Sequence, residues 1–586
     1  MTRALVQWIS GPVLRARPQG AFALREAVRV GARNLLGEVI RVQRDEIVVQ
    51  VYEDTTGLRP GTEVHGCGGP LSVRLGPAVL GGIFDGLLRP ISGVTEGGPW
   101  VQPGGEERKV KRFPFEPVVT NGDRLPPGGV LGIVKPRSGT QQYTLVPPNI
   151  GGVVEALVGE GEYGDNEVLC RITDARGNAH PVTMGHQWPV RRPRPVAQRL
   201  PSDELLLTGQ RVVDCLFPVA RGGKAAIPGG FGTGKTVFLE TLAKWCNADV
   251  IVYVGCGERG NEMAGLLEDF IRLEDPRTGR LLAERTVIIA NTSNMPVAAR
   301  EASIYTGVTV AEYFRDQGFH VAVMADSTSR WAEALREVSG RVGELPGEGG
   351  YPAYLSSRLA DFYERAALVK TLAGPIGSVT LMGAVSPPSS DFSEPVTSHT
   401  KRYIRSLWAL DAQRAYARFY PAIHPLQSYS LDAEGLARWW HAAGCVRWQE
   451  LRTRFLTILE AQTHLERMAR IIGKDAMPVR QRYTLLCADL INEGFLRQFA
   501  FSPVDRFASP SRQAVMMRLI GQFLDASQKA IDQGATPETI QALPVFRRLM
   551  RMGEEIGEGE WERFSDLSRD LDQALAEFAG GEGVTS

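Results

Sequence analysis

The 586-residue sequence contains no long hydrophobic run, because no segment approaches the ~18 consecutive apolar residues of a membrane span. Residues 1–7 also lack the apolar stretch of a secretory signal peptide. Net charge is absent too, since 66 basic residues balance 66 acidic ones. Nucleic-acid binding through bulk charge is therefore not expected, and the pattern indicates a cytoplasmic protein that serves a membrane, if at all, from outside it.

Cysteine is sparse and unpaired: the seven residues are scattered, odd in number and form no C-x-x-C pair. Neither a disulfide framework nor a zinc site is expected from this pattern. Cys215, Cys246 and Cys487 stand among apolar neighbours, which predicts thiols in a core. The content of 43% hydrophobic and 23% charged residues is typical of a soluble globular protein. The length suggests roughly three or four domains.

The most informative stretch is residues 229–236, Gly-Gly-Phe-Gly-Thr-Gly-Lys-Thr, which matches the phosphate-binding pattern G-x-x-x-x-G-K-[ST]. Residues without a Cβ let the backbone curl and aim its N–H groups at an anion. The lysine supplies a positive charge for the β- and γ-phosphates, and the threonine hydroxyl is a hard oxygen ligand for Mg²⁺. The predicted nucleotide-binding residues are Gly229, Gly230, Phe231, Gly232, Thr233, Gly234, Lys235, Thr236 and Val237.

The flanks of this loop have the expected character. Residues 224–227 read as the end of a short strand, and residues 237–245 read as a helix with Val237, Leu242 and Trp245 among its apolar positions. A helix that begins at the loop directs its positive dipole end to the phosphates. The alternative, a glycine-rich turn that precedes Lys-Thr by chance, does not require a strand and a helix on either side.

Two further strand ends carry polar residues that suit phosphoryl transfer. Residues 321–326 form an apolar strand that ends at Asp326, a Walker B arrangement in which the carboxylate supports Mg²⁺ partly through water. The alternative role for Asp326 is to cap the following helix. Glu258 lies just beyond a strand at 249–254 and is placed to polarise an attacking water, with Arg259 beside it and Glu262 as a secondary partner. An exposed Glu–Arg turn is the alternative interpretation.

The coarse pattern predicts a multidomain fold. Short strands dominate the first seventy residues: residues 4–14 have strand composition, and residues 37–52 read as two strands joined at 43–46, as in a small closed barrel. A proline- and glycine-broken β-rich module follows, and then an extended basic linker at 188–195. Apolar strands alternate with helices up to about 425, which indicates a parallel sheet. Helical apolar stripes follow from about 431, including Leu451, Phe455, Ile471 and Ile472.

These motifs resemble the catalytic A subunits of vacuolar- and archaeal-type rotary ATPases, in their bacterial form. The resemblance runs through residues 208–219, 255–263, 291–296, 324–336, 346–354 and 383–395, and it covers essentially the whole chain. It implies an N-terminal β-barrel (1–72), a connection (73–110), an inserted β-rich module (111–190), an α/β P-loop (RecA-like) ATPase domain (191–430) and a C-terminal helical domain (431–586). Gly230 and Thr233 differ from the usual family wording of the loop, and no loop cysteine is present for redox control.

The resemblance also implies roles for residues. Lys235, Glu258 and Arg259 are expected to be catalytic, and Thr236 and Asp326 to bind Mg²⁺. Tyr420 and Phe501 match the stretches that supply adenine-stacking aromatics, although core packing is a rival explanation for both. The expected cofactors are ATP/ADP and Mg²⁺.

The implied assembly is a hexamer in which three copies alternate with three non-catalytic B subunits, each of which supplies an arginine finger. Central and peripheral stalks connect this ring to a membrane rotor that moves H⁺ or Na⁺, so the chain is expected at the cytoplasmic side of the membrane. Two alternatives remain open: a different motor with a similar core, such as a protein-export ATPase or an RNA translocase, and a binding-only subunit of the same ring.

Overall fold

The computed structural model describes residues 2–91, 111–135, 140–275 and 278–579. The chain forms two compact units that are discontinuous in sequence. The first unit combines Met1–Pro201, Gly222–Lys224 and Ala248–Tyr403, and the second combines Ser202–Arg221, Ala225–Asn247 and Ile404–Ser586. Part of the predicted connection 73–110 lies outside the described residues. Among the described residues, no helix has both the length and the apolar character to cross a membrane.

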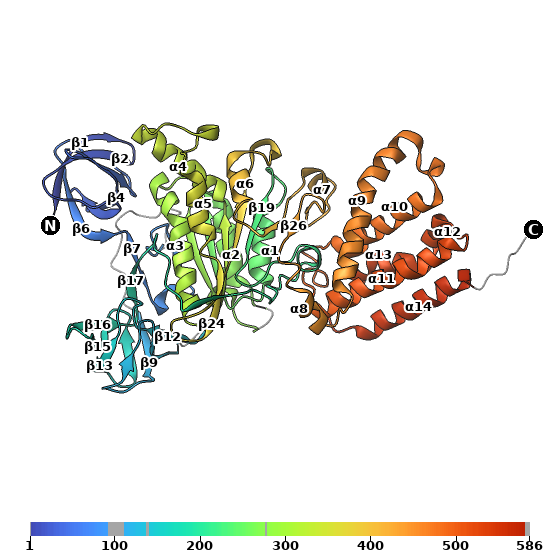
Figure 1. Cartoon of the computed structure of the whole chain (residues 1–586), viewed down its shortest axis with the longest axis horizontal. Coiled ribbons are helices and arrows are strands. Elements are labelled where there is room, and N and C mark those ends of the chain that lie inside the picture. Colours follow the sequence, from blue (N-terminus) through green and yellow to red (C-terminus); the bar gives the residue numbers. More distant parts are fainter. Residues whose placement is uncertain (1, 92–110, 136–139, 276–277, 580–586) are drawn as a thin grey trace, which may run out of the picture. The chain divides into compact units, whose positions relative to one another are not determined.

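The first unit begins with a closed six-stranded barrel, as the short strands predict (Figure 1). Residues 4–14 divide between two strands at the turn Gly11–Pro12, and the predicted hairpin at 37–52 is confirmed as β4 and β5. Its core consists of valine, leucine and alanine side chains such as Val28, Val39 and Val49. The strands, in the spatial order β1-β2-β5-β4-β3-β6, are β1 (Arg3–Ser10), β2 (Val13–Pro18), β5 (Ile47–Val51), β4 (Leu35–Val42), β3 (Glu26–Val30) and β6 (Glu63–Pro70).

The β-rich module consists of two four-stranded antiparallel sheets around a shared apolar core that includes Phe115, Leu131 and Leu169. One sheet contains β10 (Arg124–Leu125), β13 (Gly152–Glu155), β15 (Val168–Thr173) and β16 (Ala179–Thr183). The other contains β12 (Gln142–Leu145), β11 (Val130–Val134), β9 (Arg112–Pro117) and β14 (Gly161–Gly164). A two-stranded ribbon of β7 (Ser72–Leu75) and β17 (His186–Pro189) flanks the module in sequence.

The linker after β17 has no helix, as its prolines predict, but two of its arginines, Arg191 and Arg194, are wholly or partly buried, whereas Arg192 is exposed. Arg194 is buried and pairs with Asp316 (Nε–Oδ2 2.6 Å), and Arg191 bonds to Glu38 and Glu301. Burying a guanidinium is tolerated only where carboxylates compensate its charge, and here those carboxylates lie far away in sequence. The linker therefore attaches the barrel and module to the α/β part of the unit.

The α/β part of the first unit contains the predicted parallel strands. They lie in the order β8 (Ile83–Phe84), β21 (Thr286–Asn291), β20 (Val250–Cys256), β22 (His320–Asp326) and β24 (Ile376–Val385), and antiparallel β23 (Ala367–Lys370) and β18 (Gln198–Leu200) follow β24. The helices are α2 (Gly260–Arg272), α3 (Val297–Asp316), α4 (Thr328–Val342), α5 (Leu355–Tyr363) and α6 (Pro395–Thr400). Helix α3 is buried over almost its whole length, because it packs on β20 and β22 as well as on α4.

The second unit contains β19 (Lys224–Pro228), which pairs in parallel with β25 (Ser406–Leu407), and β26 (Tyr429–Ser430) beside it. Helix α1 (Lys235–Trp245) follows β19, and α7 (Ala412–Tyr416) follows β25. A π-helical turn at Val212–Leu216 lies in the stretch before β19.

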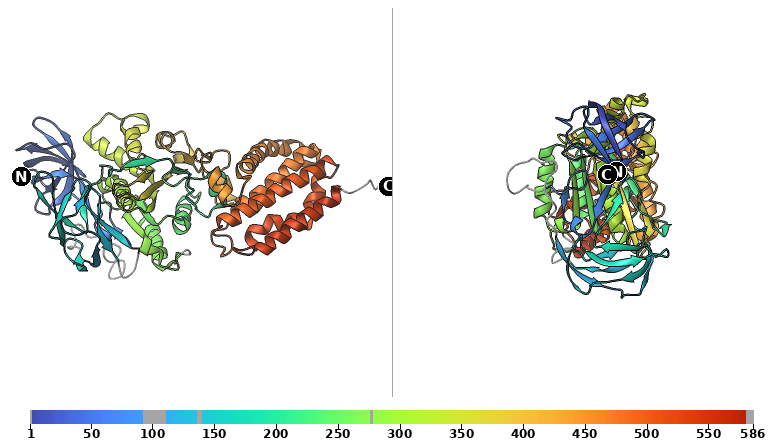
Figure 2. Two further views of the ribbon diagram at one scale, coloured as in Figure 1. Left: turned by 60° about the horizontal axis from the view of Figure 1, so that its bottom comes forward. Right: turned by 90° about the vertical axis from the view of Figure 1, so that its left-hand side faces the viewer.

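The remainder of this unit is helical, as predicted from about residue 431 (Figures 1 and 2). Leu451 and Phe455 are buried, whereas Ile471 and Ile472, which continue the same predicted stripe, are exposed because they lie at the end of α9. The helices are α8 (Ala437–Ala442), α9 (Trp448–Ile472), α10 (Val479–Ile491), α11 (Pro510–Asp532), α12 (Pro537–Ala542), α13 (Pro544–Glu555) and α14 (Trp561–Ala579), with a π-helical turn at Asn492–Leu496 after α10.

Candidate nucleotide-binding and catalytic site

The loop between β19 and α1 adopts a conformation that depends on glycine. Gly232 and Gly234 have φ of +77° and +85°, in the left-handed region that L side chains rarely adopt. A Cβ on Gly229 would lie 2.6 Å from Thr233 Oγ1 and 2.9 Å from Leu410 Cβ. No atom of the described residues lies within 4 Å of the position that a Cβ on Gly232 would take. The predicted strand, loop and helix are therefore confirmed, and the loop is a tight turn that ends at the N-terminus of α1.

Lys235 lies over this loop. Its Nζ donates to the carbonyl oxygens of Gly229 (2.8 Å) and Gly230 (2.7 Å). The buried Thr233 hydroxyl donates to the carbonyl of Gly230 (2.9 Å), so it stabilises the turn from inside. Phe231 projects into solvent with 87% of its surface exposed. The lysine charge, the glycine backbone and the start of α1 are thus held together as a phosphate-binding loop requires.

Val237, one of the predicted apolar positions of this helix, has 49% of its surface exposed. Leu242 is fully buried, as predicted. The difference arises because Val237 is in the first turn of α1, where the loop rather than a packing partner surrounds the helix.

Two predicted aromatics lie in the same unit as the loop. Tyr420 approaches the loop, because its Cε1 is 3.6 Å from the position that a Cβ on Gly234 would take. The Gln498 N–H donates to the carbonyl of Tyr420 (2.8 Å), which brings the segment carrying Phe501 alongside. Phe501 is 81% exposed and Tyr420 is 38% exposed. Core packing therefore does not explain either residue, because both rings keep exposed surface.

The carboxylates predicted to act in chemistry lie in the first unit, on two neighbouring strands. Strand β20 runs parallel to β22, with Gly255 beside Asp326 in register. Glu258 follows two residues after the end of β20, just before α2 begins at Gly260. Because both strands end at the same edge of the sheet, Asp326 and Glu258 lie near enough for the charge of Asp326 to act on Glu258. Arg259 at the start of α2 forms an ion pair with Glu262 (Nη1–Oε1 4.0 Å).

Asp326 is not the cap of the helix that follows it. The cap is Ser327, whose Oγ accepts the backbone N–H of Arg330 (3.5 Å). The Asp326 carboxylate is buried and accepts a hydrogen bond from the Tyr253 hydroxyl (Oη–Oδ2 3.3 Å). A buried carboxylate at a strand end, not used for capping, has the hard-oxygen chemistry that suits Mg²⁺, as does the Thr236 hydroxyl on α1 in the other unit.

The electrostatic surroundings of Glu258 favour proton uptake. Burial, the negative charge of Asp326 and that of Glu262 raise the pKa of the Glu258 carboxyl to about 7. The positive charge of Arg330 opposes this shift. Glu258 is half-buried beside Asp326, whereas Arg259 is exposed, so the interpretation as an exposed turn describes the arginine but not the glutamate. Glu258 has the pKa of a residue that exchanges protons near neutrality.

Three residues of these two sites were not identified from sequence. Tyr253 positions Asp326, Arg330 lies beside Glu258, and Phe499 packs on Phe501 with ring centroids 6.1 Å apart. The alternation in Gln498-Phe-Ala-Phe501 is a signal for the paired aromatics. Tyr253 and Arg330 have no local signal, because their significance depends on partners more than seventy residues away in sequence.

A strand, glycine loop, lysine and helix, together with a parallel sheet whose strands end in carboxylates, define a P-loop nucleotide-binding protein. Family models match four consecutive parts of the chain: the ATP synthase alpha/beta family beta-barrel domain (6–68), the barrel-sandwich domain (107–191), the nucleotide-binding domain (209–430) and the C-terminal domain of V and A type ATP synthase (438–540). The chain belongs to the ATP synthase alpha/beta family, among the A (alpha) subunits of the A and V types.

Full-length relatives support this assignment. The A subunit of the A-type ATP synthase of Methanopyrus kandleri is 49% identical over 577 residues, covering 97% of each chain. The V-type ATP synthase alpha chain of Halothermothrix orenii is 47% identical over 573 residues with the same coverage. Among solved structures, the ATPase EscN of the enteropathogenic E. coli type III secretion system aligns with a TM-score of 0.63 over 88% of this chain and 99% of that one. Its 21% identity shows the shared fold alone.

Proposed function

We propose that this chain is the catalytic subunit of a rotary ATP synthase of the V/A type, and that it hydrolyses or synthesises ATP in an ion-transporting complex. The observation that carries this proposal is identity of 47–49% along 97% of the chain to subunits of that kind. The position of Glu258 adds a chemical reason, because a subunit that only binds nucleotide has no use for a carboxylate poised to accept a proton.

The phosphate-binding step is assigned to the loop. The backbone N–H groups of residues 229–236 and the Lys235 ammonium are proposed to hold the β- and γ-phosphates. In the structure Lys235 donates to two loop carbonyls, and phosphate oxygens are stronger acceptors for the same ammonium group. Tyr420 and Phe501 are proposed to contact the adenine, since both expose ring surface within the same unit.

The chemical step is assigned to residues at the ends of β20 and β22. Glu258 orients the attacking water and accepts its proton, and Arg259 neutralises charge at the γ-phosphate. One family domain, 209–430, contains both the loop and these residues, which supports their action on one nucleotide. Mg²⁺ would be held by Thr236 and Asp326, and when bound it neutralises the negative charge that develops on the phosphate oxygens. Tyr253 keeps the Asp326 carboxylate oriented.

We further propose the assembly that the family implies. The chain alternates with a B subunit that contributes an arginine finger, and central and peripheral stalks connect the ring to a membrane rotor that carries H⁺ or Na⁺. An arginine supplied in trans is worth about 10³–10⁵ in rate in comparable enzymes. The isolated chain should therefore turn over ATP slowly. The domain boundaries proposed above (1–72, 73–110, 111–190, 191–430 and 431–586) are part of the same proposal.

A protein-export ATPase is the competing motor, because EscN shares the fold. The match of residues 107–191 to the barrel-sandwich domain and of 438–540 to the V and A type C-terminal domain favours the synthase instead. Copurification of the tagged chain with stalk subunits supports the synthase, whereas copurification with secretion components contradicts it.

The decisive test is ATP hydrolysis by the ring reconstituted with the B subunit. The Glu258→Gln ring should lose about 10²–10⁴-fold in kcat but still bind ATP. Glu268→Gln is the matched control, because Glu268 is exposed on the same helix α2 and should leave kcat unchanged. If the Glu258→Gln ring hydrolysed ATP at the wild-type rate, the catalytic role proposed for Glu258 would be wrong.

A further inference from the structure

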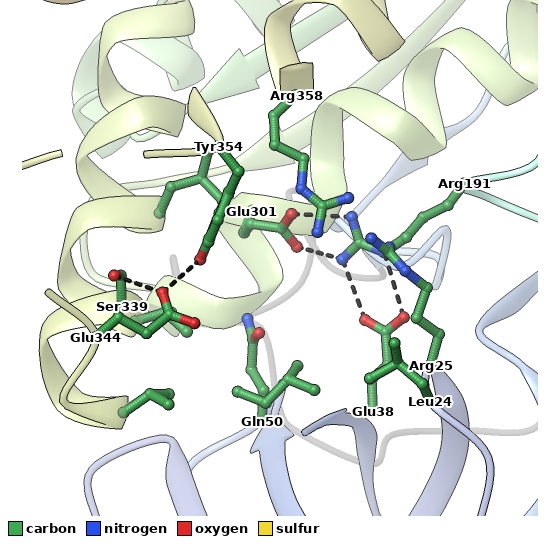
Figure 3. Close-up of a pocket in the computed structure, with 14 residues that line it drawn as sticks. Leu24, Arg25, Glu38, Gln50, Arg191, Glu301, Ser339, Glu344, Tyr354 and Arg358 are labelled. Atoms are coloured by element: carbon green, nitrogen blue, oxygen red, sulfur yellow. Dashed lines mark hydrogen bonds and ion pairs between the residues drawn. The ribbon is translucent and has the colours of Figure 1, made fainter. Parts of the chain in front are cut away.

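A cavity of about 160 Å³ lies within the first unit, between the barrel and helices α3, α4 and α5 (Figure 3). None of the residues assigned above to nucleotide binding or catalysis lines it. It reaches the surface at Leu24, of which 60% is exposed. The cavity is large enough for several water-sized groups, since one water occupies about 30 Å³ in the liquid.

Three guanidinium groups gather at one end of the cavity: Arg25 from the barrel, Arg191 from the linker and Arg358 from α5 (Figure 3). Arg191 is neutralised there. It donates from Nη1 to Glu301 Oε1 (2.9 Å) and from Nη2 to Glu38 Oε2 (3.1 Å). Two carboxylates thus face three guanidinium groups, and one positive charge remains in excess at this end.

Arg25 and Arg358 carry that excess. Within the described part of the chain, neither has a carboxylate oxygen within the 4.0 Å of an ion pair, and the marked contact of Arg358 is with the ring of Tyr354, 5.5 Å from its centroid. Both side chains are half-buried. Burial and the positive charges of Arg358 and Arg191 lower the pKa of Arg25. The charges of Glu38 and Glu301 oppose this shift, but both carboxylates are already bonded to Arg191. Half-buried like charges without a direct ion-pair partner are costly, and an anion between them would reduce that cost.

A neutral donor also faces the cavity. Gln50 on β5 is 3% exposed, and its Nε2 is buried without a hydrogen-bond partner in the described structure. Figure 3 shows its amide directed into the middle of the cavity. A buried amide N–H₂ without an acceptor is unfavourable, so such a group marks a place where an acceptor belongs.

The remaining carboxylate of the cavity, Glu344, lies at the opposite end (Figure 3). It accepts hydrogen bonds from Ser339 Oγ (2.7 Å) and Tyr354 Oη (3.0 Å), which stabilise its negative charge at that end. The lining also includes an apolar wall formed by Leu335, Val338 and Val342 of α4. The cavity therefore has a cationic end with a donor beside it and an apolar wall.

We propose that this cavity binds an oxyanion of the phosphate class, held by the guanidinium groups of Arg25 and Arg358 with the Gln50 amide as an additional donor. A guanidinium presents paired N–H groups that match phosphate oxygens. Because Arg25 belongs to the barrel and Arg358 to α5, the bound anion links these two parts of the unit. The apolar wall leaves room for a short alkyl group, so the source is either free phosphate or a small phosphate monoester.

The test is equilibrium dialysis of radiolabelled inorganic phosphate against the full-length Lys235→Ala chain, at constant ionic strength set with chloride. Lys235→Ala removes the lysine contact and so weakens phosphate binding at the nucleotide loop. The arginine variants then identify the part of the binding that belongs to the cavity. One phosphate per chain should bind, and Arg25→Gln or Arg358→Gln in this background should weaken binding at least about tenfold. Arg17→Gln is the matched control, because Arg17 is exposed on the barrel and the charge change is the same. It should leave phosphate affinity unchanged.

A competition arm identifies the source. Unlabelled propyl phosphate and unlabelled inorganic phosphate each compete with the labelled phosphate. Stronger competition by propyl phosphate indicates a site for a phosphate monoester, and equal competition indicates a site for free phosphate. If neither anion bound to the Lys235→Ala chain, or if both arginine variants bound phosphate as this chain does, the site would not exist.

A second pair of variants guards against misfolding. Arg25→Lys and Arg358→Lys keep the positive charge that the fold has accommodated but remove the paired N–H groups. Both should fold, bind phosphate more weakly, and show a smaller phosphate-dependent rise in melting temperature than the Lys235→Ala chain. An unchanged rise in both lysine variants would exclude the guanidinium contacts.

Discussion

Arg211 and Asp505 form a buried ion pair across 294 residues of sequence, with Nη1 and Oδ1 2.5 Å apart. Arg211 also donates from Nε to the carbonyl of Phe495 (2.6 Å) and from Nη2 to that of Arg497 (2.6 Å). The backbone N–H of Phe499 donates to the other oxygen of Asp505 (3.0 Å). Arg211, which directly precedes the π-helical turn Val212–Leu216, thus fixes the segment that carries Phe499 and Phe501.

The first prediction follows from this pair. Arg211→Met removes the close partner of the buried Asp505 carboxylate and leaves it only the longer ionic contact with Arg512 (3.9 Å). The free energy of unfolding of the second unit should fall by about 3–5 kcal/mol. Thermal and denaturant unfolding of the chain measures the loss. Arg497→Gln, which breaks an exposed pair with Glu493, should change stability by less than about 1 kcal/mol. Equal effects of the two substitutions would show that burial of the pair is unimportant.

A second prediction concerns Asp214, a buried carboxylate that accepts four hydrogen bonds. The donors are Thr208 N (3.0 Å), Thr208 Oγ1 (2.7 Å), Gly209 N (2.8 Å) and Gln513 Nε2 (2.8 Å). In Asp214→Asn, an NH₂ group replaces one carboxylate oxygen and faces the two donors that this oxygen accepts from. About two hydrogen bonds are therefore lost, and the free energy of unfolding should fall by about 2–4 kcal/mol. Asp203→Asn, at an exposed aspartate of the same segment, is the control and should unfold as the wild type does.

The adenine assignment gives a third prediction. Tyr420→Ala and Phe501→Ala should each weaken ATP binding about 3- to 10-fold, because stacking on an aromatic ring contributes roughly 0.5–1.5 kcal/mol. Tyr416→Ala is the control, since Tyr416 is 82% exposed on α7 nearby and has no assigned role. Titration of a fluorescent ATP analogue against each chain measures the affinities. If Tyr416→Ala weakened binding as much as the other two, the aromatic assignment would be wrong.

The pH dependence of hydrolysis is a fourth prediction. Glu258 acts as a proton acceptor only when deprotonated, and its pKa is about 7, so kcat of the reconstituted ring should rise as pH increases through about 7. Glu262→Gln removes a negative charge that raises this pKa. In Glu262→Gln the rise of kcat with pH should therefore occur at lower pH, whereas in Glu268→Gln it should occur at the same pH as in the wild type. An acid limb that does not move in Glu262→Gln would contradict the electrostatic coupling of these two residues.

The sequence predicted those parts of the fold and site that depend on neighbouring residues. The loop at 229–236 and the strand ending at Asp326 follow from local composition and spacing, and both have the predicted form. The parts that sequence reasoning missed depend on distant partners. The sequence predicts an extended basic linker, but it does not predict that Arg191 bonds to Glu38 and to Glu301, which are 153 and 110 residues away. No local pattern identifies such partners, because only the tertiary fold brings them together.

The most direct measurement of the central claim is ATP-driven ion uptake into vesicles that carry the whole complex, recorded with and without Na⁺. The wild-type complex should accumulate ions when ATP is added. The complex with Glu258→Gln should accumulate none while it still binds ATP, and the complex with Glu268→Gln should match the wild type. Uptake by the Glu258→Gln complex at the wild-type rate, or no uptake by an intact wild-type complex, would contradict a catalytic role for this chain in ion transport.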